Sequence, residues 1–350
     1  MVSRVPTELS RLENLKGLFT QYHTNVKENR RYYDLDFRDL VEPPPSEDGS
    51  NDIHAVMATT ARRAIDDPAD HILPIPRIRI PVRPTERPTV DGQSSAEVKR
   101  DFVSAWWDQE EEQYGVLAAA RKVMLNEGRV CVRKTLRWEL IPDAPANDAT
   151  PAEKAKFRRS MGKLGQYGFL WNVELLDNLS VYEDPSNPRD PRWVFVEYDI
   201  LAGEAEALFG QRDFIPTDEF STVTYTEYWS KPSHNLDGSY TPGKFVQFIN
   251  NETVHSTDNP YPYVPIAIED SGFGLAFNTA KPHERYVGIT QFAHDIFVAE
   301  SRQMTTMENV AEITGFSPVV TRNFPEEKTI SLGPRAVIPL QGAKGQPEAE

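Results

Sequence analysis

The residues best suited to chemistry in this sequence are carboxylates, since 53 Asp and Glu stand against 38 Lys and Arg. They gather in runs such as Glu110–Glu112 and in the group Asp177, Glu183 and Asp184. Two carboxylates held across a cleft could serve a glycosidase as acid and nucleophile or base. Charge runs are more often solvated faces of helices and strands. We therefore expect no catalytic residues, and keep an acidic polysaccharide hydrolase as the alternative hypothesis.

Histidine, cysteine and glycine are placed unfavourably for a metal or cofactor site. The 7 histidines are scattered, and His283 and His294 would share a helix face while lying three turns apart. Cys131 is the single cysteine, so the chain cannot form an internal disulfide. The phosphate loop, the dinucleotide-binding glycine motif and the serine nucleophile elbow are not found in the sequence. We expect no metal, no cofactor and no enzymatic activity.

Arginine and tryptophan offer two further possibilities. Arg129, Arg133 and Arg137 form the polar stripe of an alternating strand and could touch phosphate, but we favour ion pairs with acids of a neighbouring subunit. The tryptophans each fall in a periodic helix or strand pattern, which favours a core or a subunit interface over a sugar-stacking cleft. The tryptophans are Trp106, Trp107, Trp138, Trp171, Trp193 and Trp229.

Composition limits the partners of the protein. With 350 residues and 39% hydrophobic content, the chain can bury a core in two or three modules. A formal charge of -15 repels polyphosphate and opposes tight nucleic-acid binding over a broad surface. No stretch approaches the roughly 20 apolar residues of a membrane helix, so we expect no membrane partner. A single cysteine is consistent with a protein that folds in a reducing compartment.

Two helices are predicted in the N-terminal part. Leucines and aromatic residues recur at three- and four-residue spacing over 8–33, which predicts an amphipathic helix. The proline-rich stretch HILPIPRIRIPVRP, at 71–84, predicts an edge strand or an extended arm. Ser94 and Glu97 form a capping box that opens one long helix, and Gly128 is its natural end.

Antiparallel strands are predicted next. The segment 129–140 alternates, with Val130 and Val132 on the apolar face. Further strands are expected at 169–184, 192–200, 221–230 and 244–250. The last of these turns through Asn250 and Asn251 into another strand, since asparagine tolerates positive φ. A short helix is expected at 201–210.

The C-terminal part predicts a helix from about His283 to Ile313, on the order of 45 Å long. Its apolar face would contain Phe292, Ile296, Met304 and Met307 among others, and so long a helix needs packing partners. Two short strands linked by a polar turn are expected after it.

The order of these elements resembles the portal proteins of tailed double-stranded-DNA phages. The helix ending in RRYYDLDF, the proline-rich arm, NEGRVCVRKTLRWEL after a long helix, and NPYPYVPIAIED before another long helix carry the resemblance. It implies an α+β fold with an α/β wing domain over 1–280, a stem helix over 281–315, and the start of a β-rich clip over 316–350.

The resemblance implies a structural subunit of a homo-oligomeric ring, typically a dodecamer, at the portal vertex of the capsid. Its partners would be the terminase large subunit, a head–tail adaptor, the major capsid and scaffolding proteins, and the double-stranded DNA passing through the channel during packaging and ejection. Assembly would occur in the host cytoplasm and the final location would be the virion. Glu300, Glu308 and Glu312 would face the channel, where a negative wall lets DNA slide.

One departure from the family concerns the C-terminus. Portal proteins usually continue past the clip into a second stem helix, a tunnel loop and a crown, but this sequence stops at Glu350. We expect either a truncated chain or a divergent member of the family. A virion or adaptor protein without a DNA channel is a further alternative.

Overall fold

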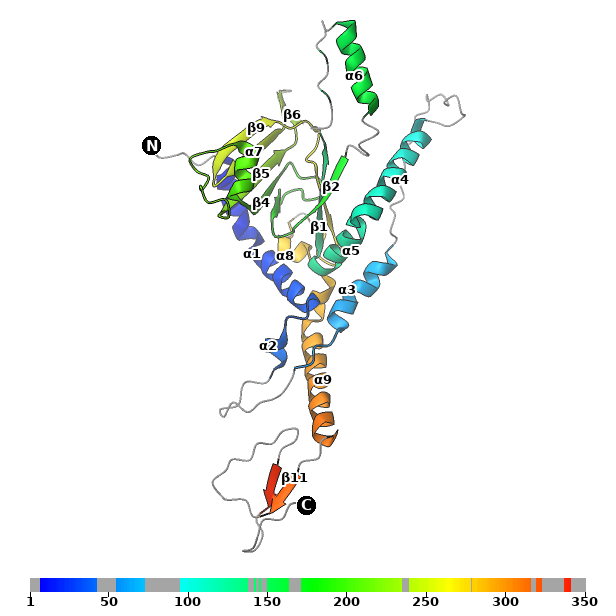
Figure 1. The fold of residues 1–350 in the computed structure, drawn as a ribbon, viewed down its shortest axis with the longest axis vertical. Coiled ribbons are helices and arrows are strands. Elements are labelled where there is room, and N and C mark those ends of the chain that lie inside the picture. The colour runs from blue at the N-terminus through cyan, green and yellow to red at the C-terminus, as the bar shows by residue number, and fades with distance from the viewer. Residues whose placement is uncertain are drawn as a thin grey trace. The chain divides into compact units, whose positions relative to one another are not determined.

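The fold is α+β, with helices set against antiparallel sheets (Figure 1). Among the described helices, none combines the length and the apolar character needed to cross a membrane. The computed structural model describes residues 7–42, 55–72, 95–137, 142, 145, 150–163, 171–234, 239–277, 279–315, 319–322 and 337–340.

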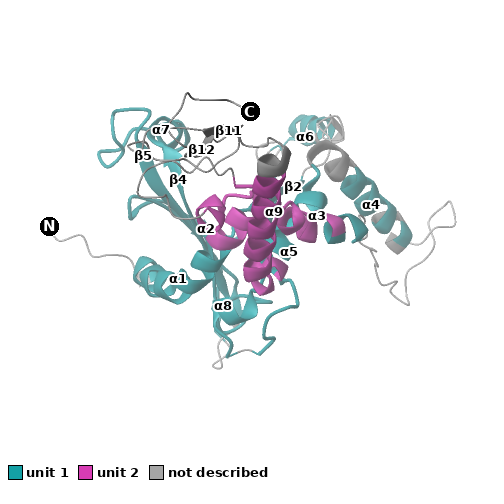
Figure 2. Ribbon diagram, turned by 90° about the horizontal axis from the view of Figure 1, so that it is seen from below, with its two compact units in different colours: residues 1–26, 68–288 teal, residues 27–67, 289–350 magenta. Residues whose placement is uncertain are grey.

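The chain forms two compact units, coloured separately in Figure 2. The first contains residues 1–26 and 68–288, and the second contains residues 27–67 and 289–350. The sequence-based division at 280 and 315, with its assignment to wing, stem and clip, stays a prediction.

Two antiparallel sheets form the framework of the first unit. The larger has the strand order β3-β4-β5-β8-β9 and the smaller has the order β10-β1-β2. Their strands are β1 (Arg129–Leu136), β2 (Trp171–Leu176), β3 (Val181–Glu183), β4 (Trp193–Leu201), β5 (Thr222–Ser230), β8 (Lys244–Ile249), β9 (Glu252–Asp258) and β10 (Ile266–Asp270). The two-stranded pair β6 (Ser233–His234) and β7 (Tyr240–Thr241) lies in the loop before β8.

Helix α1 (Thr7–Tyr33) confirms the first predicted helix and covers one face of the larger sheet. Its leucines and aromatic residues pack against β4, β5 and β8, with Phe19, Tyr22 and Val26 fully buried. The opposite face of the larger sheet is also buried. Because side chains alternate along a strand, Phe195 faces α1 while its neighbours Val194 and Val196 face the smaller sheet. The larger sheet is therefore covered on both faces.

The long helix predicted up to Gly128 is wrong as a single element, because the chain forms α4 (Ser95–Tyr114) and α5 (Val116–Glu127). Gly115 separates them with a φ of 57°, a left-handed conformation that interrupts helical hydrogen bonding. The predicted end is confirmed, since Gly128 caps α5 with a φ of 80°. A Cβ atom at Gly128 would lie 2.3 Å from the backbone nitrogen of Val287, so only glycine fits there.

Strand β1 is confirmed, but its polar stripe does not face outward as predicted. Val132 packs toward Trp106 and Val116, from α4 and α5. Residues of the opposite parity, Arg129 and Cys131, are completely buried on the side that faces the larger sheet. Covering both faces of β1 forces its arginines into the interior.

The predicted hairpin and the short helix are confirmed. Asn250 and Asn251 connect β8 to β9 with φ values of 46° and 69°, as a two-residue turn with left-handed backbone requires. Helix α7 (Ala202–Phe209) follows β4 directly. Helix α6 (Pro151–Lys163) lies between β1 and β2 in the chain and was not predicted.

The second unit is helical in its described core. It contains the end of α1, α2 (Arg38–Val41), most of α3 (Thr60–His71) and α9 (His294–Gly315). Tyr32, Phe37, Ala61 and Phe297 form its buried cluster.

The single helix predicted from His283 to Ile313 is wrong. The chain forms α8 (Pro282–Arg285), a 3-10 turn at Ile289–Phe292, and α9, whose 22 residues span about 33 Å. Tyr286 has extended backbone and its ring is buried in the first unit, beside Tyr22. Burying that ring and passing through Gly288 takes the chain out of helical geometry.

The two C-terminal strands are confirmed as β11 (Val319–Arg322) and β12 (Val337–Leu340), which pair in parallel. Some predicted features lie outside the described residues. These are the arm over 73–84, the cap Ser94 and the strand residues Trp138 to Leu140.

Candidate functional site

A cavity with a volume of about 530 Å³ lies beside the larger sheet. We call it the aromatic pocket. Trp229 and Phe245 stack at its wall, with ring centroids 3.8 Å apart, and Tyr261 lies 6.3 Å from Trp229. The residues lining the pocket are Arg133, Thr135, Glu227, Trp229, Phe245, His255, Thr257, Asp258, Pro260 and Tyr261.

Sheet register explains why these side chains meet. On β5, Tyr225, Glu227 and Trp229 have the same parity and point to the same face. Trp229 is paired with Phe245 across the ladder, which brings their rings together. Glu227 is paired with Gln247 in the same way. Alternation in these two neighbouring strands therefore forms the aromatic wall of the pocket.

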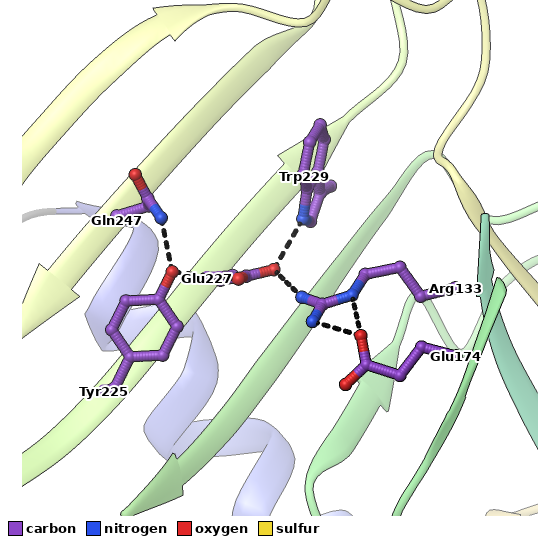
Figure 3. A network of polar contacts seen from close by, with 6 residues as sticks. All are labelled: Arg133, Glu174, Tyr225, Glu227, Trp229 and Gln247. Atoms are coloured by element: carbon purple, nitrogen blue, oxygen red, sulfur yellow. Dashed lines mark hydrogen bonds and ion pairs between the residues drawn. The ribbon is translucent and has the colours of Figure 1, made fainter. Parts of the chain in front are cut away.

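A polar network joins the two sheets at one side of the pocket (Figure 3). Arg133 of β1 donates from Nε and Nη2 to Glu174 Oε2, at 3.0 and 2.6 Å, and from Nη1 to Glu227 Oε2 at 2.8 Å. The Arg133 side chain is 16% exposed and that of Glu227 is 7% exposed. The guanidinium therefore links the smaller sheet to the larger one.

Glu227 is held by further donors. The indole nitrogen of Trp229 donates to Oε2 at 3.0 Å, and the hydroxyl of Tyr225 donates to Oε1 at 2.9 Å. Gln247 donates in turn to the Tyr225 hydroxyl. Figure 3 shows Tyr225 and Trp229 directed toward the Glu227 carboxylate, and Gln247 directed toward the Tyr225 hydroxyl. A carboxylate with so many donors is fixed in position.

The charges of the network reinforce one another. Burial alone would lower the pKa of Arg133, but attraction to Glu227 and hydrogen bonds to Glu174 raise it above its ordinary value. Burial, together with the negative charge of Glu227, raises the pKa of the Tyr225 hydroxyl. Both groups therefore keep their protons at neutral pH.

This arrangement is suited to binding. Glu227 has no oxygen free of protein donors, and such a carboxylate is a poor acid or base for sugar hydrolysis. The hydrolase alternative gains no support from it. Two carboxylates, Glu174 and Glu227, bind the Arg133 guanidinium, and Asp258 adds a third carboxylate to the lining of the pocket beside its aromatic wall. Such a site favours a ligand that is both apolar and cationic.

The sequence contains one signal for this pocket. Strand β5 places Glu227 between Tyr225 and Trp229 on a face that is otherwise apolar. An acid in that position needs a buried partner. Ion pairs of Arg129 and Arg133 with a neighbouring subunit were predicted, but both arginines are paired within the chain. The partner of Arg133 was out of reach of the sequence because it lies 94 residues away.

Arg129 forms the second buried ion pair. Its Nη1 lies 2.5 Å from Glu183 Oε2, and its Nη2 donates to the backbone oxygens of Asn178 and Val181. The guanidinium carbon also lies 4.9 Å from the Tyr22 ring centroid and 5.0 Å from that of Tyr286. This cation is enclosed on all sides and offers nothing to a ligand. Its role is to fasten α1 to the sheets.

The predicted channel-facing residues all lie on α9 and differ in environment. Glu308 is exposed. Glu300 is half-buried and accepts a hydrogen bond from Thr60 Oγ1 at 2.9 Å. For Glu312, the structure describes the backbone alone. The assignment of these residues to a channel stays a prediction.

Helix α9 buries Phe297 but exposes several of its other apolar residues to solvent. Ile296 and Met307 are each 64% exposed and Val310 is 56% exposed. Together with Met304 they fall within about 120° of the helix circumference. We call these four residues the exposed apolar face of α9. The sequence predicted an apolar face that needs packing partners, and within the described chain these four residues stay exposed.

The opposite side of α9 is buried through polar contacts. Ser301 Oγ accepts a hydrogen bond from the backbone nitrogen of Ala58 at 3.0 Å, and Thr305 Oγ1 accepts one from Val56 at 2.9 Å. Arg302 donates twice to the backbone oxygen of Leu40. Small hydroxyl residues let the extended segment 55–58 approach the helix closely.

Metal ligands do not converge in the described part of the chain, where no group of three His, Cys, Asp or Glu could hold an ion. The expected absence of a metal site stays a prediction. In comparisons with known proteins, no protein-family model matches this chain and no curated protein matches its sequence.

Proposed function

We propose that this protein is a structural subunit of a homo-oligomeric ring of the phage-portal type, through which double-stranded DNA passes. The observation that carries the proposal is the exposed apolar face of α9. Four large apolar side chains aligned on one helix are costly in water and are typical of a surface that another protein covers. In a ring, a different surface of the neighbouring copy would cover this face, because ring contacts are head-to-tail.

Charge on α9 supports the channel part of the proposal. The helix carries Asp295, Glu300, Glu308 and Glu312 against a single arginine, Arg302, whose guanidinium is bound to the backbone of Leu40. Repeating that excess of carboxylates around an axis would give a negative wall. A wall of this kind repels phosphates, so DNA would slide without adhering. The capsid, the packaging terminase and a tail adaptor are the partners that such a ring would dock.

The first experiment is to determine the mass and shape of the purified protein by light scattering and negative-stain electron microscopy. The proposal expects a closed ring with an axial hole about as wide as duplex DNA. A compact monomer at micromolar concentration would overturn it. An oligomer without a hole would favour a virion or adaptor protein that has no DNA channel.

A matched pair of variants tests the role of α9. Met307→Glu places a charge on the exposed apolar face, and we expect it to reduce the assembled fraction at least tenfold. Leu208→Glu on α7 is the control, since Leu208 is 63% exposed and Met307 is 64% exposed. Equal assembly by the two variants would remove α9 from the interface.

A further inference from the structure

We infer that the aromatic pocket binds the proline-rich segment 73–88 of a second copy of this chain. The inference rests on the proposed function, because it requires copies of the chain to associate. The segment reads LPIPRIRIPVRPTERP and lies outside the described residues. Its composition matches the chemistry of the pocket in three respects.

The first match is shape. The pocket offers the stacked rings of Trp229 and Phe245, with Tyr261 and Pro260 beside them, in a volume of about 530 Å³. Proline-rich peptides dock on aromatic grooves of this kind because their extended helix is already formed and little entropy is lost. The segment carries five prolines, including the P-x-x-P pattern Pro81 to Pro84.

The second match is charge. The segment carries four arginines against Glu86 alone. The pocket lining carries Glu227 and Asp258 against Arg133, and the guanidinium of Arg133 is also bound by Glu174. Asp258 is exposed at the end of β9 and is free to meet an arginine at the pocket mouth. An arginine that stacks on Trp229 would gain a cation–π contact as well.

The third match is reach. Ile72, just before the segment, is held by a hydrogen bond from Arg121 Nη1 to its backbone oxygen at 2.6 Å. Helix α4 begins at Ser95. The 22 residues between these points can span at most about 36 Å outward and return. An arm from one copy in a pocket of the next makes a head-to-tail contact, the type of contact from which closed rings are built.

Disulfide trapping tests the inference in the assembled protein. Ile80→Cys and Thr257→Cys are combined, since Thr257 is an exposed residue at the pocket. The native Cys131 does not interfere because it is completely buried, and burial raises the pKa of its thiol to about 12. We expect mild oxidation to give a ladder of covalently linked oligomers. The control combines Ile80→Cys with Thr217→Cys. Thr217 is exposed in the loop that precedes β5, whereas the pocket lies near the C-terminal end of that strand.

The outcomes separate the inference from the proposed function. Rings that give no ladder above the control, or only internally linked monomers, overturn the inference and leave the ring intact. A protein that forms no rings overturns the proposed function, and this inference falls with it.

Peptide binding gives a second readout. A fluorescein-labelled peptide of residues 73–88 is titrated with the full chain under dilute conditions, and fluorescence anisotropy is followed. We expect Asp258→Asn to weaken binding roughly threefold to fivefold, and Asp213→Asn, which changes an exposed acid elsewhere, to have no effect. Trp229→Ala should weaken it by tenfold or more. Equal binding of a scrambled peptide with the same charge would overturn the inference.

Discussion

Helices α1 and α9 both carry regularly spaced apolar residues, but α1 buries most of them within the chain while α9 buries Phe297 and leaves several others exposed. Phe19, Tyr22 and Val26 of α1 have no solvent exposure. Ile296, Met307 and Val310 of α9 are more than half exposed, and the buried side of that helix presents Ser301 and Thr305. The periodicity of a helix therefore shows that it has a partner, but not whether the partner belongs to the same molecule.

The difference also appears in how each helix is fastened. Helix α1 contributes aromatic rings to the environment of Arg129, a buried cation paired with Glu183. Helix α9 is held by hydrogen bonds from its hydroxyl groups and Arg302 to backbone atoms of residues 40, 56 and 58. We expect the two helices to respond differently to substitution, and the following variants measure the contrast.

Phe19→Ala should have the largest effect. Phe19 is fully buried against Tyr182, with ring centroids 5.5 Å apart, so its removal leaves a cavity and lowers the free energy of unfolding by about 3 to 5 kcal/mol. Urea unfolding followed by circular dichroism measures the change. Phe220→Ala is the control, since Phe220 is 81% exposed and should cost less than about 0.5 kcal/mol. Similar losses would show that α1 does not depend on this packing.

Ser301→Ala should have an intermediate effect. The variant removes the acceptor for the backbone nitrogen of Ala58, which is 1% exposed, and an unsatisfied buried donor costs about 1 to 3 kcal/mol. Hydrogen exchange of the Ala58 amide, with urea unfolding, reports the loss. Thr306→Ala, on the exposed side of the same helix, should change little. If both variants behave alike, the polar side of α9 does not hold the helix.

His294 should make the second unit sensitive to pH, to a smaller extent. Burial lowers the pKa of His294 below its ordinary value of 6.5, while its ring stacks on Tyr32 and bonds Asn29 Oδ1. Because protonation favours the unfolded chain, this stability is complete above pH 6.5 and is lost progressively as the pH falls below it. The difference in urea midpoint between the wild type and His294→Gln, followed from pH 8 to pH 5, isolates the effect. A difference that does not vary with pH would contradict it.

Met307→Ala should have the smallest effect on the isolated chain. At 64% exposure, truncation should change the free energy of unfolding by less than about 0.5 kcal/mol under conditions that dissociate the assembly. The same variant should unfold more readily than the wild type once copies are associated. A loss above 2 kcal/mol in the dissociated chain would mean that the exposed apolar face is covered by its own chain.

Local patterns predicted the parts of the fold that local physics determines. The three- and four-residue spacing of α1 and the two asparagines of the β8–β9 hairpin were read correctly, because both depend on neighbouring residues. The break at Gly115 was missed, since one glycine inside a helical pattern is often tolerated. The helix predicted from His283 is interrupted at Tyr286, because the Tyr286 ring packs beside Tyr22, which is far away in the sequence.

The candidate site was beyond the sequence for a related reason. The aromatic pocket requires β1 and β5 to lie in facing sheets, and that arrangement places Arg133 beside Glu227 across 94 residues. An alternating strand predicts one polar and one apolar face, and it assigns the polar face to water. When both faces are covered, the same pattern produces buried ion pairs, which a single strand cannot reveal.

The packing of α1 also has a consequence in time. The helix is made first, but its apolar face is completed by Phe248 and Tyr286, which leave the ribosome some 230 to 260 residues later. At ordinary rates of synthesis the delay is on the order of 10 to 50 s. During that interval the apolar face of α1 is exposed on the nascent chain. The yield of folded protein in the cell should therefore depend on chaperones that bind this helix until the strands of the larger sheet have been synthesised.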